Sequence, residues 1–232
     1  MKQWIEHHKR ILQKAASALL AFMVGVCLVF MIHPVKILPK DRLLSLSRMQ
    51  EDSQRFVASS SKEPALEDLL SLDLAREEGK TQKNWVTLST FVKKFGKAAS
   101  FTQEDTSFGA QVQLGYGTPV KGIYPYKIEF HEQDGVFYLS AVQGFVPHSS
   151  LYKKKKDLKL ADFTGYQTLD RKKEKGTMVE EVLKKSGLPN SLSLTRTQDK
   201  HLLALSYQVT DGLVSLTFER DQSGQYRLSK KG

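Results

Sequence analysis

Two stretches of this chain, 91 positions apart, carry the same local pattern. The longer one, residues 176–190, reads GTMVEEVLKKSGLPN. Thr177 can cap a helix with its side-chain oxygen, and the glutamates that follow favour the positive end of the helix dipole. Two lysines suit the negative end, and Gly187 suits a left-handed residue after the last turn. With apolar residues at helical spacing, the pattern predicts a short helix with one apolar face.

The same pattern occurs earlier, in residues 85–96, which read WVTLSTFVKKFG and in which Thr87 opens the helix. The offset of 91 links Gly96 with Gly187, Leu114 with Leu205, and Tyr116 with Tyr207. After a loop that is three residues longer in the first copy, the offset becomes 88, which links Phe130 with Phe218 and Tyr138 with Tyr226. Because one gap aligns helices, strands and aromatic positions, we interpret the pattern as an internal duplication.

Alternating apolar and polar residues after each helix predict antiparallel strands with one buried and one wet face. Three dipeptides indicate hairpin turns: Asp134–Gly135, Asp211–Gly212 and Ser223–Gly224. Further short helices are predicted at 65–74 and 158–169. The predicted fold class is therefore α+β, with an N-terminal transmembrane helix followed by two similar modules, each of short helices packed on an antiparallel sheet.

A charge-free apolar run, residues 15–32, lies near the N-terminus. Its 18 residues approach the minimum for crossing a bilayer, about 17–25. The preceding segment carries four basic residues against Glu6, which predicts a cytoplasmic N-terminus by the positive-inside rule: Lys2, Lys9, Arg10 and Lys14. We therefore expect a single-pass protein of the cell membrane whose bulk is extracytoplasmic.

A cleaved signal peptide is one alternative for this run, and a buried helix of a soluble protein is another. The run exceeds the usual apolar core of a signal peptide, about 7–15 residues, and no small-x-small cleavage site follows it. Cys27, the only cysteine, lies inside the run. The remaining chain can therefore form no disulfide, which is typical of a bacterial exterior protein rather than a small secreted eukaryotic domain.

Composition shifts and breaker residues divide the chain into six segments. Proline residues follow the apolar run, and a Ser-rich cluster around residues 58–64 has linker composition. The predicted segments are a cytoplasmic tail 1–14, a transmembrane helix 15–33, a stalk or linker 34–64, a first module 65–148, a basic linker 149–157 and a second module 158–232.

The helix of the second copy and the strands after it resemble the small α+β modules of the β-lactamase inhibitory protein-like fold, including outer-membrane lipoprotein modules of the SmpA/OmlA kind. The motif is carried by Gly176, Thr177, Met178, Glu181, Val182, Gly187 and Pro189. In the first copy Trp85, Thr90 and Ala98 replace the Gly, Glu and Pro. The resemblance covers roughly residues 65–232 and is of the Gram-positive, membrane-anchored type. It implies a non-enzymatic protein that presents a concave sheet to another protein.

No arrangement of residues indicates catalysis, a metal site or a cofactor. His7 and His8 lie on the cytoplasmic side of the predicted span, and the histidines show no metal-ligating spacing. Ser59 and Lys62 form a Ser-x-x-Lys pattern, but within a linker and without supporting motifs. We therefore predict no catalytic residue, no metal and no cofactor.

Tyrosines and lysines are the candidate binding residues. Tyrosine offers a rigid surface with a polar tip, so protein binding is predicted for Tyr116, Tyr124, Tyr126, Tyr138, Tyr207 and Tyr226. The alternative is that half or more of these rings belong to the core. A lysine run in the basic linker is the candidate polyanion contact, with a solvated linker as the alternative: Lys153, Lys154, Lys155 and Lys156.

The predicted function is a membrane-anchored extracytoplasmic module that binds another cell-envelope protein without catalysis. The net charge of +10 raises an alternative, an electrostatic binder of anionic wall polymer or lipid head groups. An enzyme of unrecognised type is a second alternative. Nucleic acid fits the charge but not the predicted topology, so it is not an expected partner.

Overall fold

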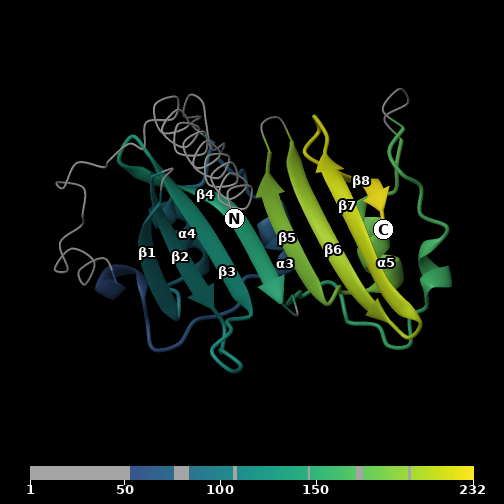
Figure 1. The fold of residues 1–232 in the computed structure, drawn as a ribbon, viewed down its shortest axis with the longest axis horizontal. Coiled ribbons are helices and arrows are strands. Elements are labelled where there is room, and N and C mark those ends of the chain that lie inside the picture. The colour runs from purple at the N-terminus through teal and green to yellow at the C-terminus, as the bar shows by residue number, and fades with distance from the viewer. Residues whose placement is uncertain (1–52, 76–83, 107–108, 146, 171–174, 198–199) are drawn as a thin grey trace, which may run out of the picture. The chain divides into compact units, whose positions relative to one another are not determined.

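Eight antiparallel strands form one continuous sheet in the computed structural model (Figure 1). The structure describes residues 53–75, 84–106, 109–145, 147–170, 175–197 and 200–232. The strands are β1 Ser100–Thr106, β2 Gly109–Tyr116, β3 Tyr126–Gln133, β4 Val136–Phe145, β5 Ser191–Arg196, β6 His201–Val209, β7 Gly212–Arg220 and β8 Tyr226–Lys231. Their order in the sheet is their order in the chain.

Because neighbouring strands run in opposite directions, the connections between them alternate between the two ends of the sheet. We call the end where β2, β4 and β6 finish the linker end, because residues 117–125 and the long connection from β4 to β5 leave from it. The opposite end, the hairpin end, carries the short turns of β1–β2 and β3–β4.

The helices lie on one face of the sheet (Figure 1). They are α3 Leu66–Leu70, α4 Leu88–Phe95, α5 Val179–Ser186 and a 3-10 turn, η2 Leu160–Phe163. Side chains of the helices and of one sheet face share a single buried cluster. Phe91 of α4, for example, packs edge-on against the rings of Tyr116 and Phe130, with centroids 5.8 and 5.5 Å away.

The predicted α+β class is wrong, because the described part of the chain is mostly β and contains one sheet rather than two. The helix expected at 65–74 has only five residues, and that expected at 158–169 is a four-residue 3-10 turn. The strands of the two halves join where β4 pairs with β5, with Val142 opposite Leu194. Periodicity indicates which face of a strand is buried but not which strand lies beside it.

The predicted transmembrane helix 15–33 lies outside the described residues. Among those described, no helix combines the length and the apolarity needed to cross a bilayer. Residues 53–64, the described part of the predicted stalk, lie against the first half of the sheet. Phe56 is buried there, its ring stacked on Phe101, and Ser61 accepts a hydrogen bond from the backbone N–H of Gly117.

Equivalent details recur in the two halves. Tyr116 of β2 donates a hydrogen bond to the carbonyl of Gly96 at 2.8 Å, and Tyr207 of β6 donates one to the carbonyl of Gly187 at 3.0 Å. Each glycine directly follows a helix, α4 or α5. A register irregularity lies between residues 129 and 130 in the β3–β4 ladder and between residues 217 and 218 in the β7–β8 ladder. The recurrence in sequence thus has a counterpart in hydrogen bonding and register.

The starts of the two helices differ. Thr87 caps α4, because its hydroxyl accepts a hydrogen bond from the N–H of Thr90. The residue before α5 is Met178, whereas Thr177 accepts from the N–H of Gln167, so the predicted cap is wrong. The glycine after α5 has the expected positive φ, +74°, but its ψ of −165° lies outside the left-handed helical region. A Cβ there would lie 2.3 Å from the carbonyl oxygen of Lys153, which requires glycine at this position.

The segment around α3 connects distant parts of the sheet. The guanidinium of Arg220 on β7 contacts the carboxylate of Asp73, and that of Arg196 on β5 donates to the carbonyl of Leu74 at 2.6 Å. Burial raises the pKa of Asp73, but hydrogen bonds from Arg220 and Asn84 outweigh burial and lower it. The chain before β1 is thereby tied to the second half of the sheet.

Tyr116→Phe and Tyr207→Phe should each destabilise the protein by about 1–3 kcal/mol, because each leaves a carbonyl at a helix end without its partner. The sites are four strand spacings apart, roughly 19 Å, so the double variant should be additive to within about 0.5 kcal/mol. Urea unfolding measures the three values, with Tyr124→Phe as the half-buried control. A loss in only one variant would contradict the equivalence of the two hydrogen bonds.

Acid should weaken the attachment of α3 to the connection after β4. Burial raises the pKa of Glu67, but hydrogen bonds from Ser150 and its neighbours lower it to about 2. Since folding lowers this pKa, the stability contribution is complete above about pH 5 and is lost as the pH falls toward 2. Unfolding free energy should therefore fall across this window, and less in Glu67→Gln than in the native chain. Asp68→Asn, on the same helix, is the control, and an equal loss in all three proteins would contradict the assignment.

Candidate functional site

Four of the six tyrosines predicted to bind a partner lie in the core: Tyr116, Tyr126, Tyr207 and Tyr226, each at most 2% exposed. Tyr126 accepts a hydrogen bond from the N–H of His148 at 2.9 Å. Burial raises the pKa of Tyr126 to about 12 and that of the other three as well. These rings hold the core together and offer no surface to a partner, as the alternative interpretation had it. For Tyr116 and Tyr207, alternation with the buried leucines two positions earlier, Leu114 and Leu205, was a signal for burial.

The other two tyrosines are half-buried. Tyr138 packs edge-on against Trp85, with ring centroids 5.7 Å apart. Tyr124, in the loop 117–125, covers Gly115 of β2, because a Cβ on that glycine would lie 2.6 Å from the ring. Gly115 has its position on the sheet face opposite the helices, since its neighbours in β2, Leu114 and Tyr116, are in the helix-side core.

That opposite face, which we call the open face, carries no helix among the described residues (Figure 1). It is lined mainly by small or uncharged polar side chains, in rows set by the strand register: Thr102, Gln113, Gln143, Ser193, Ala204 and Thr217. All of these except the exposed Thr102 are half-buried. Hydroxyl and amide groups of this kind donate and accept hydrogen bonds along the whole sheet.

Two ion pairs partly neutralise the charges on the open face. Lys127 binds Glu129 at 2.8 Å, and at the hairpin end Lys200 binds Glu219 at 2.9 Å. Within the described ranges, no group of three or more His, Cys, Asp or Glu side chains is placed to hold a metal ion. The open face is therefore suited to hydrogen bonding and shape recognition.

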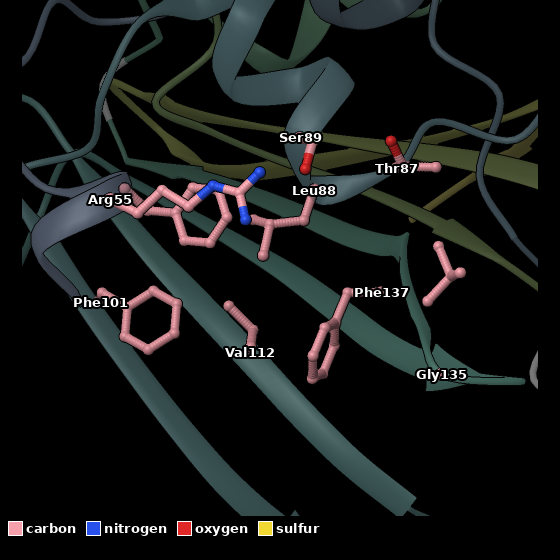
Figure 2. A pocket seen from close by; sticks show the side chains of 10 residues that line it. Arg55, Thr87, Leu88, Ser89, Phe101, Val112, Gly135 and Phe137 are labelled. Carbon is pink, nitrogen blue, oxygen red and sulfur yellow. The ribbon is translucent and has the colours of Figure 1, made fainter. Parts of the chain in front are cut away.

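A cavity of about 310 Å³, with both polar and apolar lining, lies on the helix side, between residues 53–56, the start of α4 and the β3–β4 hairpin. Figure 2 shows Phe101, Val112 and Phe137 along the sheet below Leu88. Arg55 lies at the cavity with its guanidinium 5.2 Å from the centre of the Phe56 ring. Sequence reasoning missed this cavity because its walls come from separate segments, and no local pattern encodes their meeting.

The predicted polyanion contact is accessible. Lys153, Lys154, Lys155 and Lys156 are all exposed. Their backbone is held against the end of α5: the N–H of Leu188 donates to the carbonyl of Lys153 at 3.1 Å, and the ammonium of Lys155 donates to the carbonyl of Lys185 at 2.6 Å. The run is thus a fixed strip on the surface.

No protein-family model, curated protein or solved structure matches this chain. The resemblance to β-lactamase inhibitory protein-like modules remains a prediction.

Gly115→Ala should displace the Tyr124 ring from the open face, because the added Cβ cannot fit beneath it. Overpacking of this kind costs about 1–3 kcal/mol. Thermal unfolding should register the loss, and hydrogen exchange in residues 117–125 should accelerate. Gln113→Ala, two positions earlier on the same face, is the control and should leave exchange in the loop unchanged. Unaltered exchange in Gly115→Ala would show that Tyr124 does not anchor the loop.

Proposed function

We propose that this chain is a membrane-anchored, extracytoplasmic module that binds another cell-envelope protein through the open face, without catalysis. The observation that carries the proposal is a continuous eight-stranded sheet with one face free of described helices. The anchor and the location rest on the apolar run 15–32 and the basic residues before it.

The size of the open face supports a protein partner. Eight strands about 4.8 Å apart, each about eight residues long, span roughly 34 Å by 26 Å, or about 900 Å². One partner contributes about 800 Å² to a standard-sized interface. The open face is thus large enough for specific binding without any contribution from the helices.

The chemistry of the open face favours a protein over a polyanion. Lys127 and Lys200 are paired with glutamates, and the exposed Lys230 lies only at the β8 edge, so the centre of the face presents little unbalanced positive charge. Ser, Thr and Gln side chains suit the polar, water-containing contacts of reversible protein interfaces. Tyr124 adds an aromatic side chain beside β2 at the linker end.

Site-specific photocrosslinking in living cells tests this proposal. A photoreactive amino acid replaces Gln113 or Ser193 on the open face, or exposed Glu181 on α5 as the control. Both open-face positions should give an adduct of the same mass that is absent for Glu181. Ala204→Arg, beside Ser193 in the register, should reduce that adduct by placing an unpaired charge within the interface. Equal labelling from all three positions, or none from the open face, would contradict the proposal.

A further inference from the structure

Exposed large apolar side chains gather at the linker end of the sheet. Six of the seven in the described residues belong there: Val120, Ile123, Phe145, Leu151, Leu160 and Leu213. The seventh, Val136, opens β4 at the hairpin end. Hydrogen bonds show that Leu160 and Leu151, which lie outside the strands, also belong to this end. The N–H of Leu160 donates to Asp211 beside the β6–β7 turn, and that of His148, three residues before Leu151, donates to Tyr126 at the start of β3.

Two of the most exposed of these side chains occupy a stiff turn. Val120 and Ile123 exchange two backbone hydrogen bonds, of 2.9 and 3.0 Å, across Lys121 and Gly122. Both central residues have positive φ, +51° and +80°, as in the tight turns of β-hairpins. The side chains of Val120 and Ile123 are 69% and 61% exposed. The turn therefore holds two aliphatic groups in water with a lysine between them.

Basic side chains share this end. The two main helices both finish here, each with a lysine pair in its last turn, 93–94 in α4 and 184–185 in α5. The exposed run 153–156 crosses the end of α5. Several acidic groups at this end are engaged by neighbours: Glu67 is bonded to Ser150, Asp68 lies 3.8 Å from Lys94, and Asp211 accepts from the N–H of Leu160. Positive charge is thus in excess where the apolar side chains are exposed.

In the first half of the sheet, the hairpin end carries acidic rather than basic side chains. Glu104 and Asp105 lie beside the β1–β2 turn, and Glu132 and Asp134 lie at the β3–β4 turn. In this half of the sheet, the charge difference between the two ends favours an orientation in which the basic linker end faces an anionic surface and the acidic turns face away from it.

We propose that the linker end docks on an anionic lipid bilayer. Val120 and Ile123 enter the head-group region, and Lys153–Lys156 face the lipid phosphates. A lipid surface fits better than a soluble polyanion because exposed aliphatic groups gain by leaving water at a bilayer, whereas a hydrated polymer offers them no such gain. Docking at the ends of the strands leaves the open face available, so this inference does not depend on the partner proposed above.

Hydrogen exchange of the full chain in vesicles tests the proposal. The chain is reconstituted into phosphatidylcholine vesicles with or without phosphatidylglycerol, at low and high salt. With anionic lipid at low salt, residues 117–125 and 151–156 should exchange more slowly than in phosphatidylcholine alone, while the β3–β4 turn should be unaffected. High salt should reduce the protection, because it screens the lysines.

Variants distinguish the contribution of the aliphatic side chains from that of the lysines. Val120→Ser with Ile123→Ser should abolish protection of the loop, with Val136→Ser at the hairpin end as the matched control. Each Lys→Gln change in the run 153–156 should weaken docking about fivefold. Equal protection in neutral and anionic vesicles, or none in either, would overturn the proposal. So would protection of residues 151–156 by soluble polyphosphate without lipid to the same extent as by anionic vesicles, since that result assigns the lysines to a polymer.

Discussion

The pairing of β4 with β5 is the contact on which the rest of the sheet depends. It joins four strands that follow α4 to four that follow α5, over a connection of 45 residues, 146–190. Separate sheets would present four edge strands, whereas the joined sheet has two, β1 and β8. Both remaining edges carry exposed charges, Glu104 and Asp105 on β1 and Lys230 and Lys231 on β8, which discourage pairing with other chains. The same pairing creates a single open face large enough for a protein partner.

Within each half, one tyrosine hydroxyl donates a hydrogen bond to the carbonyl group that directly follows the helix packed on the sheet. The last carbonyls of a helix have no partner inside the helix, and a buried tyrosine hydroxyl needs one. Tyr116 with Gly96 and Tyr207 with Gly187 satisfy both needs together. This explains why residues that look like binding aromatics in the sequence are structural. In both halves the tyrosine lies 20 positions after the glycine to which it donates.

The fold separates two kinds of surface. The open face is broad and polar, and its charged side chains are partly neutralised by ion pairs. The linker end is narrow and basic, with aliphatic groups held outward by a tight turn. A protein partner on the face and a bilayer at the end would therefore not compete for the same side chains. The three-residue difference between the two halves lies in the loop 117–125, which carries the exposed aliphatic side chains of Val120 and Ile123.

The sequence by itself determined the local elements: both main helices, the phase of the strands, and hairpins at Asp134–Gly135 and around Asp211. These follow from periodicity, turn residues and helix-end residues, all of which act within a few positions of the chain. Only the tertiary structure decided that the halves share one sheet, that four tyrosines are buried, and that the exposed lysines lie at the same end as Val120 and Ile123. Those outcomes depend on contacts between residues tens of positions apart, such as Val142 with Leu194 and Asp73 with Arg220. Local patterns carry no information about which distant segment will be the neighbour.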